Sequence, residues 1–443
     1  MNNNSISNES GWTVTEKGFF RFFFIYFILQ SLPLSVDFFH IVFGFNWFHI
    51  RYGDIFNISR LSAKFIPGAD SFLNWIILAI FSAAGAFLWS KQKKENYNYN
   101  ELYYWLRAIV RYRLAIGIIG YGFLKFFPMQ APFPSISNLN TAYGDFSEWK
   151  IFSMSLGIVP GYESFLGGVE IVAGLLLLFR KTASIGAIII LIFTGNVFIS
   201  NLGYGGGEYV YASYLISFAV FVLWFDAQRI YRLISLELPT QPNLYQPAFR
   251  PAMKSLRLVA KAFVLIFFVF FYGLKTYFGL RRDPYQFPRK AGLARAAGIY
   301  NVTEFKLNGK VIPYDPSNTS RWQNVVFERW ATISIRSPRT VITDSANYEQ
   351  ILSDDKSRNY ELAGSGGRHY YDYTVDTLKN QLLLENKNSH YLQERLRFNF
   401  SRPDTATIIL SGQNEIGDSI AVTLVRLHKK YPVKLGRRKT LKL

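Results

Sequence analysis

The sequence predicts a polytopic α-helical membrane bundle followed by a small antiparallel all-β domain. Half of the 443 residues are hydrophobic and 18% are charged, whereas soluble proteins carry roughly 25% charged residues. The mean hydropathy of +0.09 is too low for a chain made of membrane helices alone, so a polar portion must offset the apolar stretches. The absence of cysteine excludes disulfides, thiolate-ligated metal clusters and thiol relays.

Seven apolar stretches are close to the length of about 20 residues that a bilayer-spanning helix needs. A polar segment, residues 1–17, precedes the first stretch without a small-residue cleavage site, so this stretch predicts an anchor and not a signal peptide. A further apolar stretch, residues 38–47, is too short to cross alone and predicts an interfacial or re-entrant piece. The helical domain is expected over residues 18–280, with spans at 19–36, 72–89, 103–127, 165–179, 183–199, 210–225 and 258–278.

The distribution of lysine and arginine near the ends of the spans predicts the orientation, because these residues are enriched on the cytoplasmic side. Most cations lie at one set of ends, which places the N-terminus inside and, after seven crossings, the C-terminal region outside. Arg281 and Arg282, directly after the last span, favour the opposite orientation. The cations on the predicted inner side are Lys17, Arg21, the cluster 91–94, Arg107, Arg111, Arg180, Lys181, Arg229, Arg232, Arg250, Lys254 and Arg257, and those on the outer side are Arg51, Arg60, Lys64, Lys125 and Lys150.

The β domain is predicted from about residue 297, where short alternating runs separated by turn residues replace the long apolar stretches. Asn308-Gly309 follows the first run and is typical of a tight hairpin turn. Short strands separated by turns indicate a small antiparallel sandwich or barrel over residues 297–428. We expect a basic linker at the membrane surface over 281–296 and a basic tail over 429–443. The predicted strands are 300–307, 324–327, 332–335, 370–375, 381–384, 397–400, 407–410 and 420–427.

The net charge of +19 is spread over both parts of the chain, with +8 over residues 1–280 and +11 over 281–443. This charge favours attraction to anionic lipids or an acidic partner, and no nucleic-acid-binding motif accompanies it. We therefore expect contacts with membrane lipids and no binding of nucleic acid. The histidines of the β domain, His369, His390 and His428, are far apart and have no carboxylate at ligand spacing, so we expect this domain to serve binding and to hold no metal.

Two ionisable residues within the predicted spans, Lys125 and Glu170, form the candidate site. An ionisable side chain within a span is costly and usually marks a site or a paired contact. Lys125 closes the third span, and Glu170 lies in the fourth between the small residues Gly167 and Gly174, which allow another helix to approach closely. Because both lie toward the predicted outer side, we expect their charged groups to be within direct or water-bridged reach.

Two interpretations of this pair stay open. In the structural one, Lys125 extends its charge to the interface and Glu170 ties two helices together through a hydrogen bond. In the functional one, Lys125 acts as a base or as a cation that holds an acidic headgroup or a quinone oxygen. The long loop 128–161, rich in proline and aromatic residues, predicts either an interfacial aromatic belt or a lid over a pocket.

The membrane portion resembles the core of DoxX-like proteins. The resemblance rests on Arg111-Tyr-Arg-Leu-Ala-Ile-Gly-Ile-Ile-Gly-Tyr-Gly-Phe-Leu-Lys125 and Gly167-Gly-Val-Glu-Ile-Val-Ala-Gly-Leu-Leu-Leu-Leu-Phe-Arg-Lys181. It covers about residues 18–230 and extends more loosely to HTTM domains and vitamin K-dependent carboxylases, in which a lysine of a similar helix is catalytic. The resemblance implies a multi-pass bundle in a bacterial inner (cytoplasmic) membrane with an extracytoplasmic C-terminal domain, in a family sometimes linked to quinone or thiol oxidoreductase complexes.

Two classes of function follow from these observations. The first is a DoxX-like accessory or scaffolding subunit of a membrane complex, whose β domain binds other membrane or periplasmic proteins. The second is a membrane enzyme that acts on a quinone or lipid-like substrate, with Lys125 and Glu170 as catalytic residues. Whether the protein is an enzyme stays open at this point, and a quinone or a lipid is the cofactor class that the residues suggest.

We expect a reporter that is active only in the cytoplasm to stay silent when it is fused after Leu443. The reason is that seven crossings from an inside N-terminus end outside. The same reporter fused before Met1 should be active, and this second fusion controls for expression and insertion. Activity of the C-terminal fusion would mean that the number of crossings is even or that Arg281 and Arg282 determine the orientation.

Overall fold

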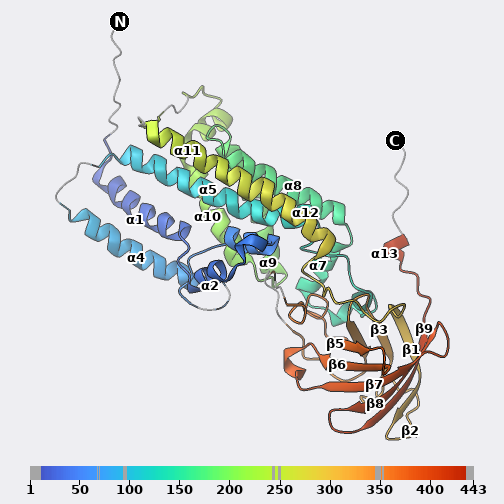
Figure 1. Ribbon diagram of the computed structural model, residues 1–443. Helices are drawn as coiled ribbons and strands as arrows, with labels where there is room; N and C mark the ends of the chain where they lie inside the picture. Colours follow the sequence, from blue (N-terminus) through green and yellow to red (C-terminus); the bar gives the residue numbers. More distant parts are fainter. Residues whose placement is uncertain are drawn as a thin grey trace, which may run out of the picture. The chain divides into compact units, whose positions relative to one another are not determined.

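The computed structural model describes residues 11–66, 68, 70–92, 97–241, 245–247, 251–344, 351 and 354–435. The chain forms two compact units, whose elements are labelled in Figure 1. The helical unit comprises Met1–Phe123, Gly167–Ser200 and Glu208–Thr276, and the barrel unit comprises Leu124–Leu166, Asn201–Gly207 and Tyr277–Leu443. Four predicted features lie wholly or partly outside the described residues, namely residues 1–10 of the polar N-terminal segment, 93–94 of the basic cluster, Arg250, and 436–443 of the basic tail.

Each of the seven predicted apolar stretches forms a helix. The helices concerned, with two shorter ones before α4, are α1 (Val14–Ser31), α2 (Val36–Gly44), α3 (Tyr52–Ser59), α4 (Phe72–Ser90), α5 (Tyr99–Phe126), α8 (Pro160–Leu177), α9 (Ala183–Gly203), α10 (Tyr209–Ser235) and the continuous α11 (Pro251–Val264), η3 (Leu265–Phe271) and α12 (Tyr272–Arg282).

Within the described residues, five segments are long and apolar enough to cross a membrane. α5 and α8 are not among them, because α5 carries three arginines and α8 carries two glutamates. These helices favour a membrane protein, and the count of seven spans stays a prediction. The five segments are Val14–Gly44, Phe72–Ser90, Ala183–Gly203, Tyr209–Ser235 and Met253–Arg282.

Glycines bring α5 and α8 into close contact. A Cβ atom at Gly174 would lie 2.5 Å from Ile119, and one at Gly122 would lie 2.8 Å from Ile171 and 3.2 Å from the carbonyl oxygen of Gly167. Side chains at these positions would therefore force the two helices apart. The expectation that the small residues around Glu170 allow another helix to approach closely is confirmed.

The β domain is a closed antiparallel barrel. Neighbouring strands pair in the order β2-β1-β3-β4-β5-β6-β7-β8-β9, and β1 also pairs with β9, so that all strands except the two-residue β2 close a ring of eight. This settles the choice between a sandwich and a barrel. The strands are β1 (Gly298–Leu307), β2 (Lys310–Val311), β3 (Asn324–Phe327), β4 (Thr332–Arg336), β5 (His369–Asp376), β6 (Gln381–Asn386), β7 (Arg395–Ser401), β8 (Thr407–Asn414) and β9 (Ser419–Arg426).

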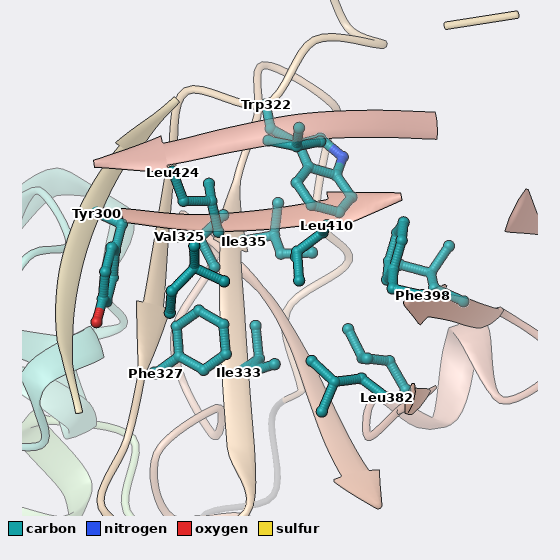
Figure 2. Packing of buried hydrophobic residues seen from close by; sticks show 14 of the residues in the cluster. Tyr300, Trp322, Val325, Phe327, Ile333, Ile335, Leu382, Phe398, Leu410 and Leu424 are labelled. Atoms are coloured by element: carbon teal, nitrogen blue, oxygen red, sulfur yellow. The ribbon is translucent and has the colours of Figure 1, made fainter. Parts of the chain in front are cut away.

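The interior of the barrel is filled by alternate side chains of its strands. Figure 2 shows Val325, Phe327, Ile333 and Leu424 meeting at its centre, and each of the four is fully buried. Period-two burial of this kind is what a strand with one core-facing side produces. Eight strands enclose a space that side chains can fill, so this barrel is a packed core.

The loop predicted over 128–161 belongs to the barrel unit and folds as α6 (Ile136–Leu139), η2 (Tyr143–Asp145) and α7 (Glu148–Gly157). The backbone N–H of Ser147 donates to the carbonyl of Gly364 at 2.8 Å, and the N–H of Gly366 donates to the carbonyl of Asp145 at 2.7 Å. The loop is therefore attached to the connection between β4 and β5. Neither the predicted aromatic belt nor the predicted lid accounts for these contacts.

The predicted basic linker over 281–296 is also packed against the barrel. The ring of Phe287 stacks on Trp330 with centroids 4.3 Å apart, and the guanidinium of Arg358 pairs with Asp283 at 2.6 Å. A segment held by a buried arginine and an aromatic stack is part of the barrel unit. The expectation that residues 281–296 form a basic linker at a membrane surface stays a prediction.

We expect the substitution Gly412→Ala to destabilise the barrel by about 1–3 kcal/mol. Gly412 lies in β8 opposite Phe398 of β7, and a Cβ atom there would overlap the carbonyl oxygen of Arg397. Because that oxygen belongs to the backbone, the strands would have to separate. Thermal unfolding of the full chain, followed by near-ultraviolet circular dichroism, measures the effect. Ser411→Ala, at the exposed neighbouring position, is the control, and an equal effect of both changes would refute the close strand approach.

Candidate functional site

The structure places the two predicted site residues in different units. Lys125 lies half-buried in the last turn of α5 and belongs to the barrel unit. Glu170 is 5% exposed on α8 and belongs to the helical unit. The prediction that they pair therefore stays a prediction, and the site is better sought within one unit.

A basic groove of about 980 Å³ lies in the helical unit, walled by α5, the C-terminal end of α8, α10 and α11. Its lining contains six cationic residues and no aspartate or glutamate. Aromatic and aliphatic side chains, among them Tyr104, Phe179 and Leu258, make up most of the remaining surface. We call this feature the basic groove, and its cations are Arg107, Arg111, Arg180, Lys254, Arg257 and Lys261.

Helical spacing aligns these cations in two rows. Arg107 and Arg111 are four residues apart on α5, and Lys254, Arg257 and Lys261 follow one another at three and four residues on α11. Residues at such spacings share one helix face. In Figure 1, α11 runs beside α5, and the two rows therefore face one groove.

Aromatic rings hold the α11 row in place. The guanidinium of Arg257 lies 5.9 Å from the ring centroid of Tyr104 on α5. The ammonium of Lys261 lies 3.6 Å from the ring of Phe179 at the end of α8. Cation–π contacts attract a positive charge without neutralising it, so the contact with Phe179 leaves the charge of Lys261 in place.

The positive charge of the groove exceeds its negative counter-charge. Arg107 pairs with Asp226 at 2.9 Å, but the same carboxylate also accepts from Arg229 at 2.8 Å. In the part of the chain that the structure describes, Arg111, Lys254 and Lys261 form no ion pair with a carboxylate. Arg111 lies close enough to Arg107, Arg180 and Lys261 for their charges to repel one another. An anion in the groove would relieve this repulsion.

A second charge cluster on α5 is balanced internally. Tyr121 lies ten residues after Arg111, about 15 Å along the helix, and its hydroxyl donates to Glu208 at 2.6 Å. Arg60 donates to Glu208 at 2.8 and 2.9 Å and to Asp70 at 3.2 Å. Lys64 pairs with Asp70 at 2.8 Å. Two cations and two carboxylates satisfy one another here, so the cluster fixes the segment after α3 to α10 and α5.

The two terminal nitrogens of Arg113 are bound by backbone carbonyls. Its guanidinium donates to the carbonyl of Ser59 at 3.0 Å and to the carbonyl of Leu61, at the C-terminal end of α3. A cation is stabilised there by the partial negative charge of the helix end. Arg113 is therefore a structural residue.

The barrel unit contains a buried polar network that attaches the segment 128–161. The carboxylate of Glu328, 1% exposed, accepts from the backbone N–H of Ser137 at 2.6 Å and from its hydroxyl at 2.7 Å. Burial, with a contribution from Glu361, raises the pKa of Glu328 to about 7. Glu361 accepts from Trp330 at 2.8 Å and from Lys387 at 3.1 Å.

The same network contains Lys150 of α7. Its ammonium donates to the carbonyl of Tyr360 and lies 3.6 Å from the ring centroid of that residue. Burial lowers the pKa of Lys150 to about 7, and the nearby carboxylate of Glu361 acts against this shift. Since each charged group has protein partners, we interpret the network as the device that holds α6 and α7 on the barrel.

His369 is likewise a structural residue of the barrel. It is 4% exposed, and Arg339 donates to its ring at 3.0 Å while pairing with Glu394 at 3.0 Å. Burial and the positive charge of Arg339 lower the pKa of His369 to about 4, so the ring is neutral at physiological pH. Over the described ranges, no group of three or more histidine, aspartate or glutamate residues could hold a metal ion.

Neither charge cluster of the helical unit was predicted as a site from the sequence. Arg107, Arg111, Arg180, Lys254 and Arg257 served there only to predict orientation, although their spacing on two helices could have indicated two cationic stripes. The pairing of Glu208 with Arg60 gave no such signal, because the two residues are 148 positions apart.

We expect the contribution of Glu328 to the stability of the barrel to be lost as the pH rises from 4.5 to about 7. In this window the folded state keeps the proton on Glu328, because the pKa of this carboxyl is raised from 4.5 to about 7. The unfolded state releases the proton. The contribution of Glu328 to the free energy of unfolding therefore falls as the pH rises. Glu328→Gln removes this titration. Near pH 4.5 the variant should melt at the same temperature as the unchanged chain. At about pH 8 it should melt a few degrees higher than the unchanged chain.

Thermal unfolding of the full chain at several pH values measures this difference. Glu304→Gln, on the exposed face of β1, is the matched control and should follow the unchanged chain at every pH. A constant offset between Glu328→Gln and the unchanged chain would contradict a raised pKa of this carboxyl group.

Comparison with known proteins assigns no family to the chain. No family model and no curated protein matches it. A solved structure of a redesigned β-barrel aligns with 32% of this chain and 98% of its own length, at 11% identity and a TM-score of 0.17, and this weak likeness carries no argument. The resemblance of residues 18–230 to DoxX-like proteins accordingly stays an expectation.

Proposed function

We propose that the protein is a lipid-binding membrane protein whose basic groove takes the anionic headgroup of a membrane lipid. The observation that carries the proposal is the lining of six cations without a single carboxylate. Basic pockets between membrane helices are the sites where anionic headgroups are recognised. Charge repulsion among the groove cations supplies the driving force, because a phosphate neutralises several of them at once.

The surroundings of the groove favour a lipid over a soluble anion. α11 belongs to the candidate span Met253–Arg282. Beside its cations it exposes Leu258, Val259 and Phe263, which are 70%, 63% and 57% accessible. Large apolar side chains at such exposure are suited to contact with acyl chains. A ligand with a phosphate and apolar chains would satisfy both parts of this surface.

We place this binding within the accessory role that the sequence predicts. All the groove cations except Lys261 were placed by sequence on the side predicted to face the cytoplasm, where anionic lipids attract basic residues. In this proposal the bundle resides in a bacterial inner membrane and the barrel is extracytoplasmic, where it binds membrane or periplasmic proteins. An enzymatic role of Lys125 and Glu170 on a quinone or lipid-like substrate stays the alternative.

We expect the double variant R111Q/K261Q to bind phosphatidylglycerol about thirtyfold more weakly than the unchanged chain. It removes one cation from each row, and each contributes about 1 kcal/mol to the attraction of an anionic lipid. The full chain in phosphatidylcholine nanodiscs is titrated with brominated phosphatidylglycerol. Quenching of Trp105, which lines the groove, reports binding, and the W105F counterpart of each protein provides the background.

The double variant K181Q/R232Q is the matched control. It removes two exposed cations of the same unit that do not line the groove, and its affinity should stay within about twofold of the unchanged chain. Equal quenching curves for R111Q/K261Q and the unchanged chain would refute the groove as a headgroup site.

A further inference from the structure

We propose that the outer face of the barrel binds a neutral, extended glycan chain. The proposal concerns the barrel unit alone and is independent of the lipid site in the helical unit. It is derived from a groove of about 1020 Å³ that is lined by residues of β5 to β9. We call this feature the polar groove, and its central hydrogen-bonding side chains are Gln381, Arg397, Asn399, Ser411 and Gln413.

These side chains point away from the core of the barrel. Arg397 and Asn399 flank Phe398 on β7, and Gln381 precedes Leu382 on β6; Phe398 and Leu382 both belong to the buried core. Successive side chains of a strand point to opposite faces. The polar residues therefore lie on the outer face, where all five are exposed.

The pairing of the strands arranges the polar side chains in rows across the sheet. Asn399 of β7 lies opposite Gln381 of β6 on one side and opposite Ser411 of β8 on the other. Arg397 lies opposite Gln413 of β8 in the next row. Neighbouring strands are about 4.8 Å apart, which is close to the length of one sugar ring in an extended glycan. Successive rings can therefore meet successive strands.

The hydrogen-bonding capacity of these rows is not used within the described part of the protein. None of the five central side chains forms a hydrogen bond or an ion pair with another described residue. An amide both donates and accepts, a hydroxyl does the same, and a guanidinium donates only. Such a mixture matches the hydroxyl groups of a sugar, because each hydroxyl is a donor and an acceptor.

The charges that border the polar groove favour a neutral ligand. The lining contains two cations, Arg395 and Arg397, and two carboxylates, Asp376 and Glu415, so its formal charges cancel. Neither an acidic nor a basic polymer gains from this balance.

A peptide that adds as a further strand is also disfavoured. Such a peptide needs a free strand edge, whereas β6, β7 and β8 are each paired on both sides. Among the described residues of the lining, the only aromatic one is Phe398, which is 2% exposed. Hydrogen bonds must therefore carry the affinity, and we expect a dissociation constant on the order of 1 mM.

The test titrates cellohexaose into the full chain in phosphatidylcholine nanodiscs, which contain no sugar headgroup. Saturation transfer from protein to sugar, measured by nuclear magnetic resonance, reports binding, and empty nanodiscs give the background. The affinity should be the same at about 50 and about 500 mM salt, because screening acts on charges. N399L removes the amide at the centre of one row and should weaken binding by about fivefold or more.

The matched control is N301L, which makes the same exchange at an exposed position of β1 outside the polar groove. Its affinity should equal that of the unchanged chain. Thermal unfolding shows whether each variant folds, and Q413L on the neighbouring strand gives an independent change with the same expected loss as N399L.

Three outcomes would overturn the proposal. The first is the absence of saturation transfer to cellohexaose, and the second is an affinity of folded N399L and Q413L equal to that of the unchanged chain. The third is tighter binding of hexaglutamate that weakens with added salt, which would assign the polar groove to an acidic peptide. The lipid site is tested separately by R111Q/K261Q, so failure of either proposal leaves the other intact.

Discussion

The neutralisation of positive charge inside an apolar helical unit is the constraint on which the rest of this structure depends. An unpaired charge away from water is costly, and α5 alone carries three arginines. The protein meets this demand in three ways. Arg113 is directed to backbone carbonyls, Arg107 to Asp226, and Arg60 to the carboxylates that follow α9 and precede α4. In the basic groove, Arg111, Lys254 and Lys261 form no ion pair with a carboxylate of the described residues, and this is why we propose the groove, and not the balanced cluster at Glu208, as the place for a lipid.

The barrel unit meets the same constraint with hydrogen-bonded networks. Closing β1 onto β9 pairs the edge strands, which removes the exposed edges that an open sheet would present. Buried polar side chains attach the segments 128–161 and 283–290 to the barrel. These side chains are Glu328, Arg358 and Lys150. Protein partners contact these groups on several sides, so burial shifts the pKa values of Glu328 and Lys150 without producing a binding site.

Much of the fold could be predicted from local pattern. The period-two alternation placed strand 324–327 at its observed bounds and the other predicted strands to within two residues, except that β8 continues four residues beyond the predicted 407–410, because alternate side chains enter the core. Asn308-Gly309 marked the hairpin correctly, since both residues adopt positive φ angles of 51° and 76°. The apolar stretches predicted the helices, because a helix in an apolar environment carries apolar side chains along most of its length. These features depend on neighbours in sequence.

The features that could not be predicted depend on contacts between distant segments. The loop 128–161 and the linker 281–296 carry ordinary polar sequences, and only the positions of Gly364, Asp283 and Trp330 in space give them partners. The basic groove likewise exists only because α11 lies beside α5, although Lys254 and Arg107 are far apart in sequence.

Charge balance also links ligand binding to the stability of the helical unit. A bound phosphate would reduce the repulsion of Arg111 by Arg180 and Lys261. A ligand that binds only the folded arrangement stabilises it by mass action. The exposed apolar face of α11 requires lipid contact in any case, and an anionic lipid supplies both the contact and the counter-charge. The position of α11 is therefore best understood as a joint property of the chain and of the lipid that we propose to lie between its cations.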